Sequence, residues 1–517
     1  MYKLGIIGFG VVGKSILTFL NRQKIDSTST NTAYDLYDDT SDLERFQVRV
    51  WDSRALVEEE QEIIKMYKAT AVDSGKVPLK DFIKENDFVI ASPGVNLNNH
   101  KEFDNKFLCE LDFFSVFFNK PVIAITGSLG KTTITKLLGR LTKASAIAPA
   151  SLHPIAQGLG LGRNMFPNTT IRSAFGGNVG IGMLDLVQQQ DDYDLGILEL
   201  SSFQLELNKK FAPDIALWTN WYPNHLDRHQ TPLQYFEAKF NLLRFQHEHQ
   251  IAILSDELFK GECGSWFNER MGQIKSKLCI CSMQKPHAEL LATIKHDSFY
   301  VFYKHDQWLE MALVEHGKCG SSVKLFNMQT LPDITFVQNW IQILTALYAL
   351  GVDLYELQKM LVQQIEPLLA DHHHRLEHFV TVNGVDFYDD SKSTVIQSTI
   401  AAFEKLSALN RPIILIVGGL GKGVDRSPLI TAVNGSANLK KLYCFGKDCG
   451  DFQGCTIYPT LVETVREAMK IAKSGDIVLF SPSGASFDLF KNYEHRGQVF
   501  RELVVNLGSL EQSASNS

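Results

Sequence analysis

A glycine turn between an apolar strand and a helix carries the most specific chemistry in the sequence. Residues 122–133 read VIAITGSLGKTT, and a helical run follows over residues 134–141. Main-chain N–H groups of such a turn bind phosphate oxygens, the lysine reaches terminal phosphates, and the adjacent hydroxyl holds Mg²⁺. The candidate phosphate ligands are Gly127, Ser128, Gly130, Lys131, Thr132 and Thr133. Only two residues separate the glycines, instead of the usual four, and a chance glycine–lysine turn is the alternative. The flanking strand and helix favour nucleoside-triphosphate chemistry.

A second glycine turn follows the first strand of the chain. Residues 8–13 read GFGVVG after the strand expected over residues 3–7, which matches a dinucleotide fingerprint. The acidic residue at the end of the next strand, Asp52, comes about forty positions later rather than about twenty. Arg54 and the turn over residues 92–94 are candidates for ligand binding at strand ends. A tight turn without a ligand is the alternative.

Two strands in the middle of the chain lead to polar side chains that suit a metal ion. Glu199 follows an apolar run, and one carboxylate with phosphate oxygens and water is a usual Mg²⁺ environment. Residues 224–229 read NHLDRH after the next strand, and Lys239 lies on the amphipathic run 233–245. Each of these residues alone has an ordinary structural explanation. The histidines at 372–374 could form a metal tract, but adjacent side chains point in different directions, so we expect no metal there.

Three polar turns follow strands in the last third of the chain. They span residues 389–394 (DDSKST), 418–423 (GGLGKG) and 481–486 (SPSGAS). Open α/β sheets bind ligands at the carboxyl ends of their strands, so we expect these turns to line one crevice. Each turn alone could be an ordinary connection. Together they predict a second substrate site that faces the nucleotide.

Apolar strands alternate with helical runs along the whole chain. This alternation predicts an α/β fold with parallel sheets covered by helices. We expect three α/β domains, over residues 1–110, 111–370 and 371–517. Residues 26–42 and 151–173 are interpreted as inserted loops, and residues 511–517 as a disordered tail.

The composition limits the partners and the compartment. The net charge is −7 without a long basic block, so we expect no nucleic-acid partner. The chain opens on a strand without a leader, and no apolar run reaches the roughly eighteen residues of a membrane helix, so we expect no membrane insertion. The eight cysteines are scattered, and Cys279 and Cys281 form the only close pair, without zinc-ligand spacing. We expect a cytoplasmic monomer in a reducing setting.

With these residues in this order, the chain resembles the Mur ligases from Gly5 to about Leu507. The diagnostic motifs lie in Leu198–Glu206, Asn224–His229, His374–Glu377, Tyr443–Gly446 and Ser481–Gly497. The resemblance implies an N-terminal Rossmann-like UDP-binding domain, a central P-loop ATPase domain and a C-terminal Rossmann-like domain that binds the amino acid. It implies an ATP-dependent amide ligase that adds D-glutamate to UDP-N-acetylmuramoyl-L-alanine through an acyl phosphate in peptidoglycan synthesis. It also implies that NAD is not a cofactor.

The resemblance implies roles for individual residues. The UDP-sugar would contact Val11, Val12, Ser53, Arg54, Gly94 and Asn178. ATP would contact Asn339, Arg375 and Asp390 in addition to the phosphate turn. D-glutamate would contact Thr394, Lys422, Ser486, Phe487 and Tyr493. One Mg²⁺ would be held by Thr132 and Glu199, and a second by His225 and a carbamylated Lys239. The catalytic residues would be Lys131, His225, Lys239 and Lys392. Capture of CO₂ turns a neutral lysine amine into the anionic oxygen ligand that Mg²⁺ requires.

Several positions depart from the family pattern. Leu129 stands where the family has Asn, Gln342 where it has a second Asn, and Leu420 where it has Asp. The usual Gly and His before Asn339 are also missing. These changes bear on nucleotide affinity and rate more than on reaction type. The alternatives are a sister ligase with another amino acid, a dinucleotide-dependent dehydrogenase built on the first glycine turn, and a non-catalytic family member.

Overall fold

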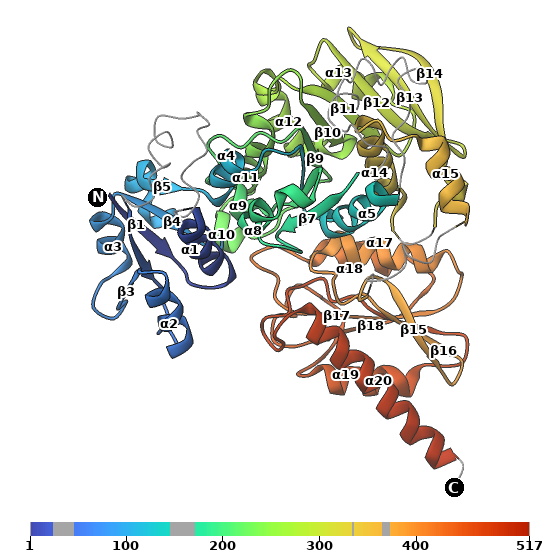
Figure 1. The fold of residues 1–517 in the computed structure, drawn as a ribbon. Helices are drawn as coiled ribbons and strands as arrows, with labels where there is room; N and C mark the ends of the chain where they lie inside the picture. The colour runs from blue at the N-terminus through green and yellow to red at the C-terminus, as the bar shows by residue number, and fades with distance from the viewer. Residues whose placement is uncertain (1, 24–45, 145–170, 333–334, 364–372, 516–517) are drawn as a thin grey trace. The chain divides into compact units, whose positions relative to one another are not determined.

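The computed structural model describes residues 2–23, 46–144, 171–332, 335–363 and 373–515 (Figure 1). Three sheets account for the strands, and the elements alternate as an α/β fold requires. The chain forms two compact units, Met1–Trp221 with Phe236–Leu368, and Tyr222–Tyr235 with Leu369–Ser517. The expected insertion at 26–42, most of the one at 151–173, and His372 lie outside the described residues.

The first sheet is parallel, with the strand order β3-β2-β1-β4-β5. Its elements are β1 (Tyr2–Ile7), α1 (Val11–Gln23), β2 (Phe46–Trp51), α2 (Glu58–Met66), β3 (Thr70–Val72), α3 (Leu79–Glu85), β4 (Phe88–Ala91), η2 (Asn98–Lys106) and β5 (Phe107–Leu108). Alternate side chains of β1 enter different cores, because successive residues of a strand point to opposite faces. Ile6 joins the core that contains Leu17 of α1, and Ile7 joins the core that contains Phe82 of α3. Helices therefore cover both faces.

The second sheet has nine strands in the order β14-β13-β12-β11-β10-β9-β6-β8-β7. The strands are β6 (Val122–Thr126), β7 (Ser173–Gly177), β8 (Leu195–Glu199), β9 (Ile215–Trp218), β10 (Ile251–Ser255), β11 (Lys277–Ser282), β12 (Ser298–His305), β13 (Trp308–Glu315) and β14 (Lys318–Asn327). The strands from β7 to β12 pair in parallel, whereas β12, β13 and β14 pair antiparallel. The antiparallel edge was not predicted.

Helices cover both faces of this second sheet. They are α4 (Glu110–Phe117), α5 (Lys131–Ala144), α8 (Met183–Gln188), η3 (Gln190–Asp192), α9 (Ser202–Leu205), α11 (Pro232–Arg244), η4 (Asp256–Phe259), α12 (Gly261–Arg270), η5 (Met271–Gln273), α13 (Ala288–Thr293), η6 (Met328–Thr330), α14 (Val337–Ala349) and α15 (Leu354–Gln363). Ile123 and Ile125 of β6 pack in the core formed with α5 and α14. Ala124, between them, joins the core that contains Phe236 and Phe240 of α11. Because β6 is buried on both faces, the phosphate turn starts from a fixed strand.

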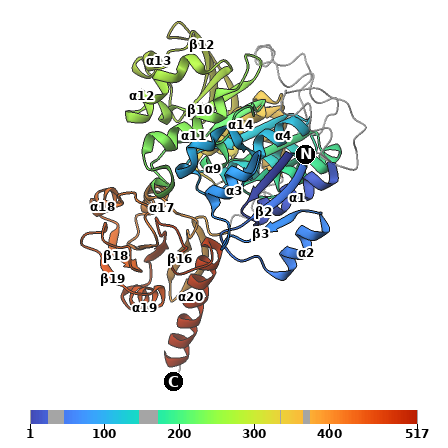
Figure 2. The same cartoon turned by 90° about the vertical axis from the view of Figure 1, so that its left-hand side faces the viewer.

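The third sheet has the order β15-β16-β20-β17-β18-β19 and is parallel except for the β15–β16 hairpin. The second compact unit contains α10 (Leu226–His229), β15 (Glu377–Val382), β16 (Val385–Asp389), α17 (Ile396–Ser407), β17 (Ile413–Gly418), α18 (Ser427–Asn434), β18 (Leu439–Phe445), β19 (Thr456–Tyr458), α19 (Leu461–Ile471), β20 (Ile477–Phe480) and α20 (Tyr493–Ser515). In both ribbon views α17 and α18 cover one face of the sheet, and α19 and α20 the other (Figures 1 and 2). The disordered tail predicted from residue 511 is wrong as far as residue 515, because α20 continues to Ser515.

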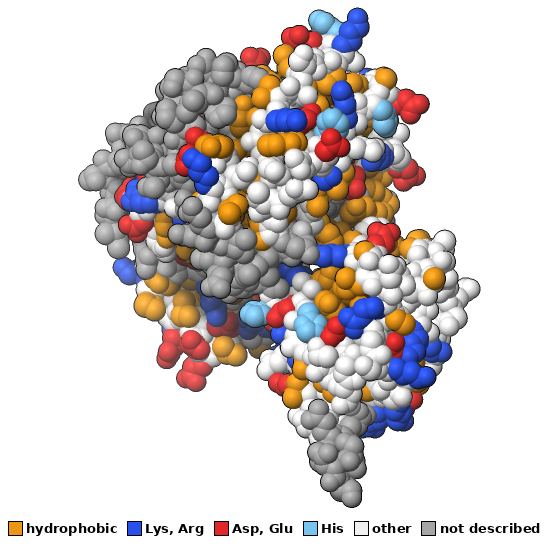
Figure 3. Space-filling view, turned by 90° about the vertical axis from the view of Figure 1, so that its right-hand side faces the viewer, with side chains coloured by type: hydrophobic (Ala, Val, Ile, Leu, Met, Phe, Trp, Pro, Cys, Tyr) orange, Lys and Arg blue, Asp and Glu red, His pale blue; other side chains and the backbone are white. Residues whose placement is uncertain are grey.

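The surface agrees with the charge expected from the composition. On the face drawn in Figure 3, acidic and basic side chains are interspersed among apolar and uncharged ones. Among the described residues, no helix is both long and apolar enough to cross a membrane.

Candidate active site

The phosphate turn between β6 and α5 requires glycine at two positions. Gly127 and Gly130 have φ angles of 145° and 83°, in the region that favours glycine. A Cβ on Gly127 would lie 1.9 Å from Thr219 Oγ1, and a Cβ on Gly130 would lie 2.7 Å from Asn339 Oδ1. The turn is therefore packed directly against β9 and the start of α14. This contact brings Asn339, a predicted nucleotide ligand, to the turn.

Two residues after β9 hold the turn in shape. Asn220 accepts hydrogen bonds from the main-chain N–H of Ser128 (3.2 Å) and, through Oδ1, from that of Leu129 (2.8 Å). Thr219 Oγ1 donates to the carbonyl of Leu129 at 2.5 Å. The main chain of Leu129 is thus fixed by its neighbours, so the turn forms without a polar side chain at this position. These contacts link residues about 90 positions apart, so no local sequence pattern indicates them.

Two lysine amines meet at the carbonyl of Gly127. Lys131 Nζ donates to this oxygen at 2.7 Å and to Ser128 O at 3.2 Å. Lys239 Nζ, on α11, donates to the same oxygen at 3.0 Å and to Thr126 Oγ1 at 3.3 Å. Lys239 is only 1% exposed. Burial, and then repulsion by Lys131, hold the pKa of the Lys239 amine well below its ordinary value, against an opposing effect of Glu199. Burial of this kind favours the neutral, nucleophilic form of the amine.

Glu199, at the end of β8, has one carboxylate oxygen without a partner. Its side chain is 1% exposed, and Oε1 accepts a hydrogen bond from Nδ2 of Asn178 at 2.9 Å. The other oxygen, Oε2, is buried and makes no hydrogen bond. Within the described ranges, no three His, Cys, Asp or Glu side chains are grouped as a metal site. A single carboxylate suits Mg²⁺, which completes its ligands with phosphate oxygens, hydroxyls and water, and the half-buried Thr132 follows Lys131 on α5. These residues fit the ion.

The first glycine turn is closed by Asp52 itself. Asp52 Oδ2 accepts the main-chain N–H of Phe9 at 2.6 Å, and Oδ1 accepts that of Arg54 at 3.0 Å. In a dinucleotide site the acidic residue at this position binds the ribose hydroxyls. Because both oxygens of Asp52 accept main-chain N–H groups and the residue is 8% exposed, Asp52 adds little support to the dehydrogenase alternative, which depends on the glycine turn.

Apart from Asn178, the residues predicted to bind the UDP-sugar lie in this turn or at strand ends of the first sheet. Val11, Ser53 and Gly94 are exposed, and Val12 is half-buried. The exposed Arg54 already has a partner, because its guanidinium donates to both oxygens of Glu60 at 2.8 Å. This hydrogen bonding lowers the pKa of the Glu60 carboxyl to about 2.

In the second unit, a buried arginine joins two of the three predicted turns. Arg496 of α20 donates from Nη2 to Ser391 O (2.6 Å), from Nε to Ser391 Oγ (3.1 Å) and from Nη1 to Gly484 O (2.9 Å). Its burial lowers the pKa of the guanidinium to about 10. The remaining turn, over residues 418–423, is joined to the turn over residues 481–486 by two main-chain hydrogen bonds of 2.9 Å between Leu420 and Ala485. The structure thus brings the three turns together, through contacts that no local sequence signal reveals.

These turns carry three of the residues predicted to bind the amino acid, Thr394, Lys422 and Ser486, whereas Phe487 directly follows the third turn and Tyr493 begins α20. Ser486 is 3% exposed, Phe487 is 69% exposed, and Thr394 and Lys422 are half-buried. Lys422 has a φ of 54°, a conformation that costs a non-glycine residue about 1 kcal/mol and tends to occur at functional sites. Lys392 Nζ lies 3.5 Å from the ring centroid of Tyr493.

The acidic pair at the end of β16 forms its hydrogen bonds within the second unit. Asp390, a predicted nucleotide ligand, accepts hydrogen bonds from Ser481 Oγ (2.7 Å) and from the N–H of Leu376 (3.0 Å). Burial raises the pKa of the Asp390 carboxyl to about 7. Asp389 accepts from His374 Nδ1 and from Arg501 Nε, both at 2.6 Å. Arg375, which lies between His374 and Leu376 in the chain, is half-buried.

The histidine expected to hold the second metal belongs to the second unit. His225 precedes α10 with a φ of 56°, and its ring centroid lies 6.2 Å from that of Tyr235. The turn over residues 418–423, which carries Lys422, is called the amino-acid turn below. In the same unit a Cβ on Gly423 would lie 3.6 Å from Leu226 Cβ, so the amino-acid turn approaches this segment. Glu199 and Lys239 belong to the first unit.

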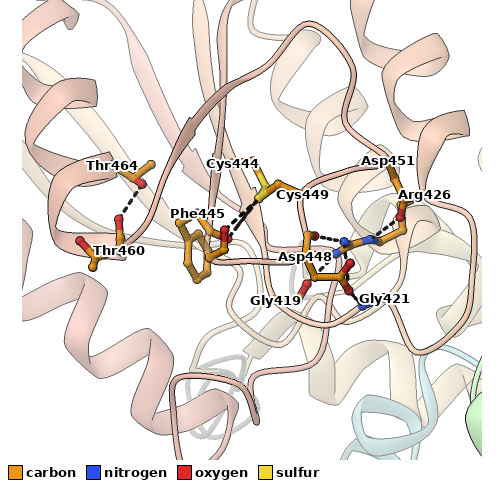
Figure 4. Close-up of a disulfide and its surroundings, with 11 residues drawn as sticks. Gly419, Gly421, Arg426, Cys444, Phe445, Asp448, Cys449, Asp451, Thr460 and Thr464 are labelled. Carbon is orange, nitrogen blue, oxygen red and sulfur yellow. Dashed lines mark hydrogen bonds and ion pairs between the residues drawn. A yellow bond between two sulfur atoms is a disulfide. The ribbon is translucent and has the colours of Figure 1, made fainter.

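Two of the cysteines in the described residues are bonded to each other. Cys279 and Cys281 are buried free thiols, whereas Cys444 and Cys449 form a disulfide (Figure 4). The separation of five residues is not a recognised signature, so the sequence alone did not indicate this bond. The expected reducing setting therefore does not follow from the cysteines.

Comparison with known proteins agrees with this architecture. Residues 125–328 match the Mur ligase middle domain, and residues 374–484 match the Mur ligase, glutamate ligase domain. The chain belongs to the Mur ligase family, as its motifs predicted.

Two curated relatives named UDP-N-acetylmuramoylalanine--D-glutamate ligase match most of the chain. The protein of Thermoanaerobacter sp. (strain X514) is 30% identical over 446 residues, which are 83% of this chain and 86% of the relative. That of Koribacter versatilis (strain Ellin345) is 29% identical over 491 residues, 90% and 93% of the two chains. A crystal structure of MurF from Acinetobacter baumannii has a TM-score of 0.50 and 15% identity, covering 89% of this chain and 90% of that one. This last likeness concerns the fold alone.

Proposed function

We propose that this chain joins D-glutamate to UDP-N-acetylmuramoyl-L-alanine at the expense of ATP, the reaction for which its two relatives are named. The observation that carries the proposal is the meeting of Lys131 and the buried Lys239 at the carbonyl of Gly127, beside the half-satisfied carboxylate of Glu199. A phosphate turn with two amines and an orphaned carboxylate oxygen is suited to ATP with a divalent cation.

The first step is phosphoryl transfer to the alanyl carboxylate. A carboxylate oxygen attacks the γ-phosphorus of ATP, the bond to the β,γ-bridging oxygen breaks, and ADP leaves. In the structure Lys131 donates to a main-chain carbonyl of the turn. When ATP binds, the phosphate would take the place of this carbonyl, and the Lys131 amine would stabilise the negative charge on the transferred phosphoryl group. When bound, Mg²⁺ neutralises phosphate charge, and Thr132 with Glu199 would hold it. Asn339, Arg375, Asp390 and Lys392 are proposed as further nucleotide contacts.

The second step forms the amide. The amine nitrogen of D-glutamate attacks the acyl-phosphate carbon, the carbon–oxygen bond to phosphate breaks, and the nitrogen loses a proton to solvent or a nearby base. Phosphorylation is needed because a carboxylate oxygen is a poor leaving group and phosphate a good one. Lys422 and Thr394 are assigned to the α-carboxylate of D-glutamate. Ser486, near Phe487 and Tyr493, is assigned to its side-chain carboxylate.

We also propose that Lys239 is carbamylated. Its amine nitrogen would attack CO₂ and release one proton, which requires the neutral form that burial favours. The resulting carbamate, together with His225, would hold a second Mg²⁺. The UDP-sugar is assigned to Val11, Val12, Ser53, Arg54 and Gly94, with Asn178 at the muramoyl group. A cytoplasmic monomer with three domains, divided near residues 110 and 370, remains part of this proposal.

The experiment that tests the first step follows oxygen atoms. The substrate is labelled with ¹⁸O in its alanyl carboxylate, and the phosphate released with D-glutamate is analysed by mass. An acyl phosphate transfers one labelled oxygen to each phosphate. Unlabelled phosphate would exclude this intermediate. Lys131→Ala should abolish phosphate release, while Lys136→Ala, also half-buried on α5, serves as the matched control and should retain it.

The carbamate is tested by chemical rescue. Lys239→Ala should be nearly inactive, and added acetate should restore part of the activity by supplying the missing oxygen ligand. Normal activity of Lys239→Ala without acetate would show that the modification has no role. Circular dichroism of the variant distinguishes lost chemistry from lost folding.

A further inference from the structure

The disulfide of the second unit closes a small ring next to the amino-acid turn. Cys444 is the penultimate residue of β18, and Cys449 lies in the segment that follows this strand. The ring between them contains Asp448 (Figure 4). Both cysteines are buried, at 0% and 3% exposure, whereas Asp448 is exposed.

Asp448 connects this ring to the turn that carries Lys422. Its Oδ2 accepts the main-chain N–H of Gly421 at 2.7 Å, and its carbonyl accepts a hydrogen bond from Nη2 of Arg426. Arg426 is 1% exposed and also donates to Gly419 O at 2.7 Å. Figure 4 shows these groups converging from the two segments. Arg426 and Asp448 thus hold the turn at residues 419 and 421, on either side of Leu420.

The position of Lys422 depends on this attachment. Lys422 follows Gly421 directly and has a φ of 54°. A non-glycine residue persists in this conformation only where the surrounding contacts determine it. The ring restricts the conformations that residues 445–448 can adopt, because a covalent link between the ends of a segment removes most of its freedom. An intact ring therefore keeps Asp448 where it can hold Gly421.

We propose that the Cys444–Cys449 disulfide is a redox-sensitive clasp on the amino-acid turn, so that its reduction weakens binding of D-glutamate. This inference rests on the proposed function of the turn. A dithiol reductant supplies two electrons and two protons: the S–S bond breaks, both cysteines become thiols, and the reductant becomes a disulfide. Because both sulfurs are buried, exchange requires the segment after β18 to open first. Reduction is therefore slow, and faster in Asp448→Asn, which weakens the attachment.

The test uses the full-length enzyme before and after treatment with dithiothreitol. Alkylation under denaturing conditions should label six of the eight cysteines before reduction and all eight after it. Reduction should raise the KM for D-glutamate about three- to tenfold, since loss of one ordinary hydrogen bond changes binding by roughly this factor. The KM for ATP should change less than twofold. Reoxidation should reverse the effect.

Variants distinguish loss of the Cys444–Cys449 bond from nonspecific effects of dithiothreitol on the enzyme. The double variant Cys444→Ser/Cys449→Ser should have the KM of the reduced enzyme and no response to dithiothreitol. Cys319→Ser, at a free half-buried cysteine, should keep the wild-type response. Asp448→Asn should raise the KM for D-glutamate with the disulfide intact, which keeps the proposal testable if the double variant fails to fold. Eight labelled cysteines before reduction, or an unchanged KM after full reduction, would overturn the proposal.

A second measurement distinguishes failure of the disulfide proposal from failure of the proposed function. Absence of any D-glutamate-dependent turnover would refute the function, and hydrogen exchange then decides the inference. Residues 418–423 should exchange faster after reduction, because the N–H of Gly421 loses its partner. Unchanged exchange in this turn would refute the clasp.

Discussion

Replacing Glu110 by Gln tests the electrostatics of a carboxyl buried at the start of α4. The Glu110 side chain is 6% exposed, and its Oε2 makes no hydrogen bond. Burial, and to a smaller extent the charge of Asp185, raise the pKa of the Glu110 carboxyl to about 8, from an ordinary 4.5. The folded protein therefore holds a proton here at neutral pH, while the unfolded chain does not.

The sign of the pH dependence follows from this difference. Between pH 4.5 and 8 the folded state binds more protons at this group than the unfolded state, so stability falls as the pH rises. Each pH unit between the two pKa values costs about 1.4 kcal/mol, which gives a penalty of about 5 kcal/mol above pH 8. Glu110→Gln carries no such penalty. Relative to the wild type, the variant should gain up to about 5 kcal/mol between pH 4.5 and 8.5.

The assay is urea unfolding of both proteins across this pH range, followed by tryptophan fluorescence. An unpaired amide in the variant adds a pH-independent cost of about 1–3 kcal/mol, so the change with pH is diagnostic rather than the absolute stability. Glu59→Gln, at an exposed carboxylate on α2, is the control and should track the wild type. A stability difference between Glu110→Gln and the wild type that stays constant over this range would refute the reasoning.

Two further substitutions test the turns. Gly130→Ala places a side chain at a φ of 83°, with its Cβ 2.7 Å from Asn339 Oδ1. The KM for ATP should therefore rise about tenfold or more. The control, Gly272→Ala, has open space around its Cβ and should bind ATP normally. An unchanged KM in Gly130→Ala would contradict the assigned turn. Arg496→Met should lower the stability of the second unit by about 3 kcal/mol, because the carbonyls of Ser391 and Gly484 lose their donor. Thermal unfolding should therefore show an earlier transition. An unchanged melting temperature would contradict this role of Arg496.

The parallel parts of the fold could be predicted from the sequence, but the antiparallel edge could not. Strands such as β6 and β17 are buried on both faces and therefore appear as continuous apolar runs before a glycine turn. By contrast, β14 is mostly exposed and reads KCGSSVKLFN, with little apolar alternation. Its pairing with β13 arises from tertiary context, which local patterns do not encode.

For the candidate site, the sequence indicated the turns but not what fixes them. Glycine and lysine spacing located the phosphate turn because that chemistry depends on a local pattern. Asn220 and Arg496 hold the turns through contacts between residues 91 and 105 positions apart, and only folding brings these partners together. Arg426 donates to Gly419, which is only 7 positions away, but no local pattern marks this contact. Asp52 was considered as the acidic residue of the dinucleotide pattern because it follows the second strand, although it comes about forty positions after the glycine turn rather than about twenty. Its oxygens close the turn itself.

The measurement that tests the central claim most directly is phosphate release with ATP, UDP-N-acetylmuramoyl-L-alanine and one amino acid at a time. D-glutamate should give phosphate and amide product in equal amounts. D-alanine should be a poor substrate, because it lacks the second carboxylate and leaves buried donors near Ser486 unpaired, at a cost of roughly 1–3 kcal/mol per group. Preference for L-alanine or a diamino acid, or no release with any amino acid, would contradict the account.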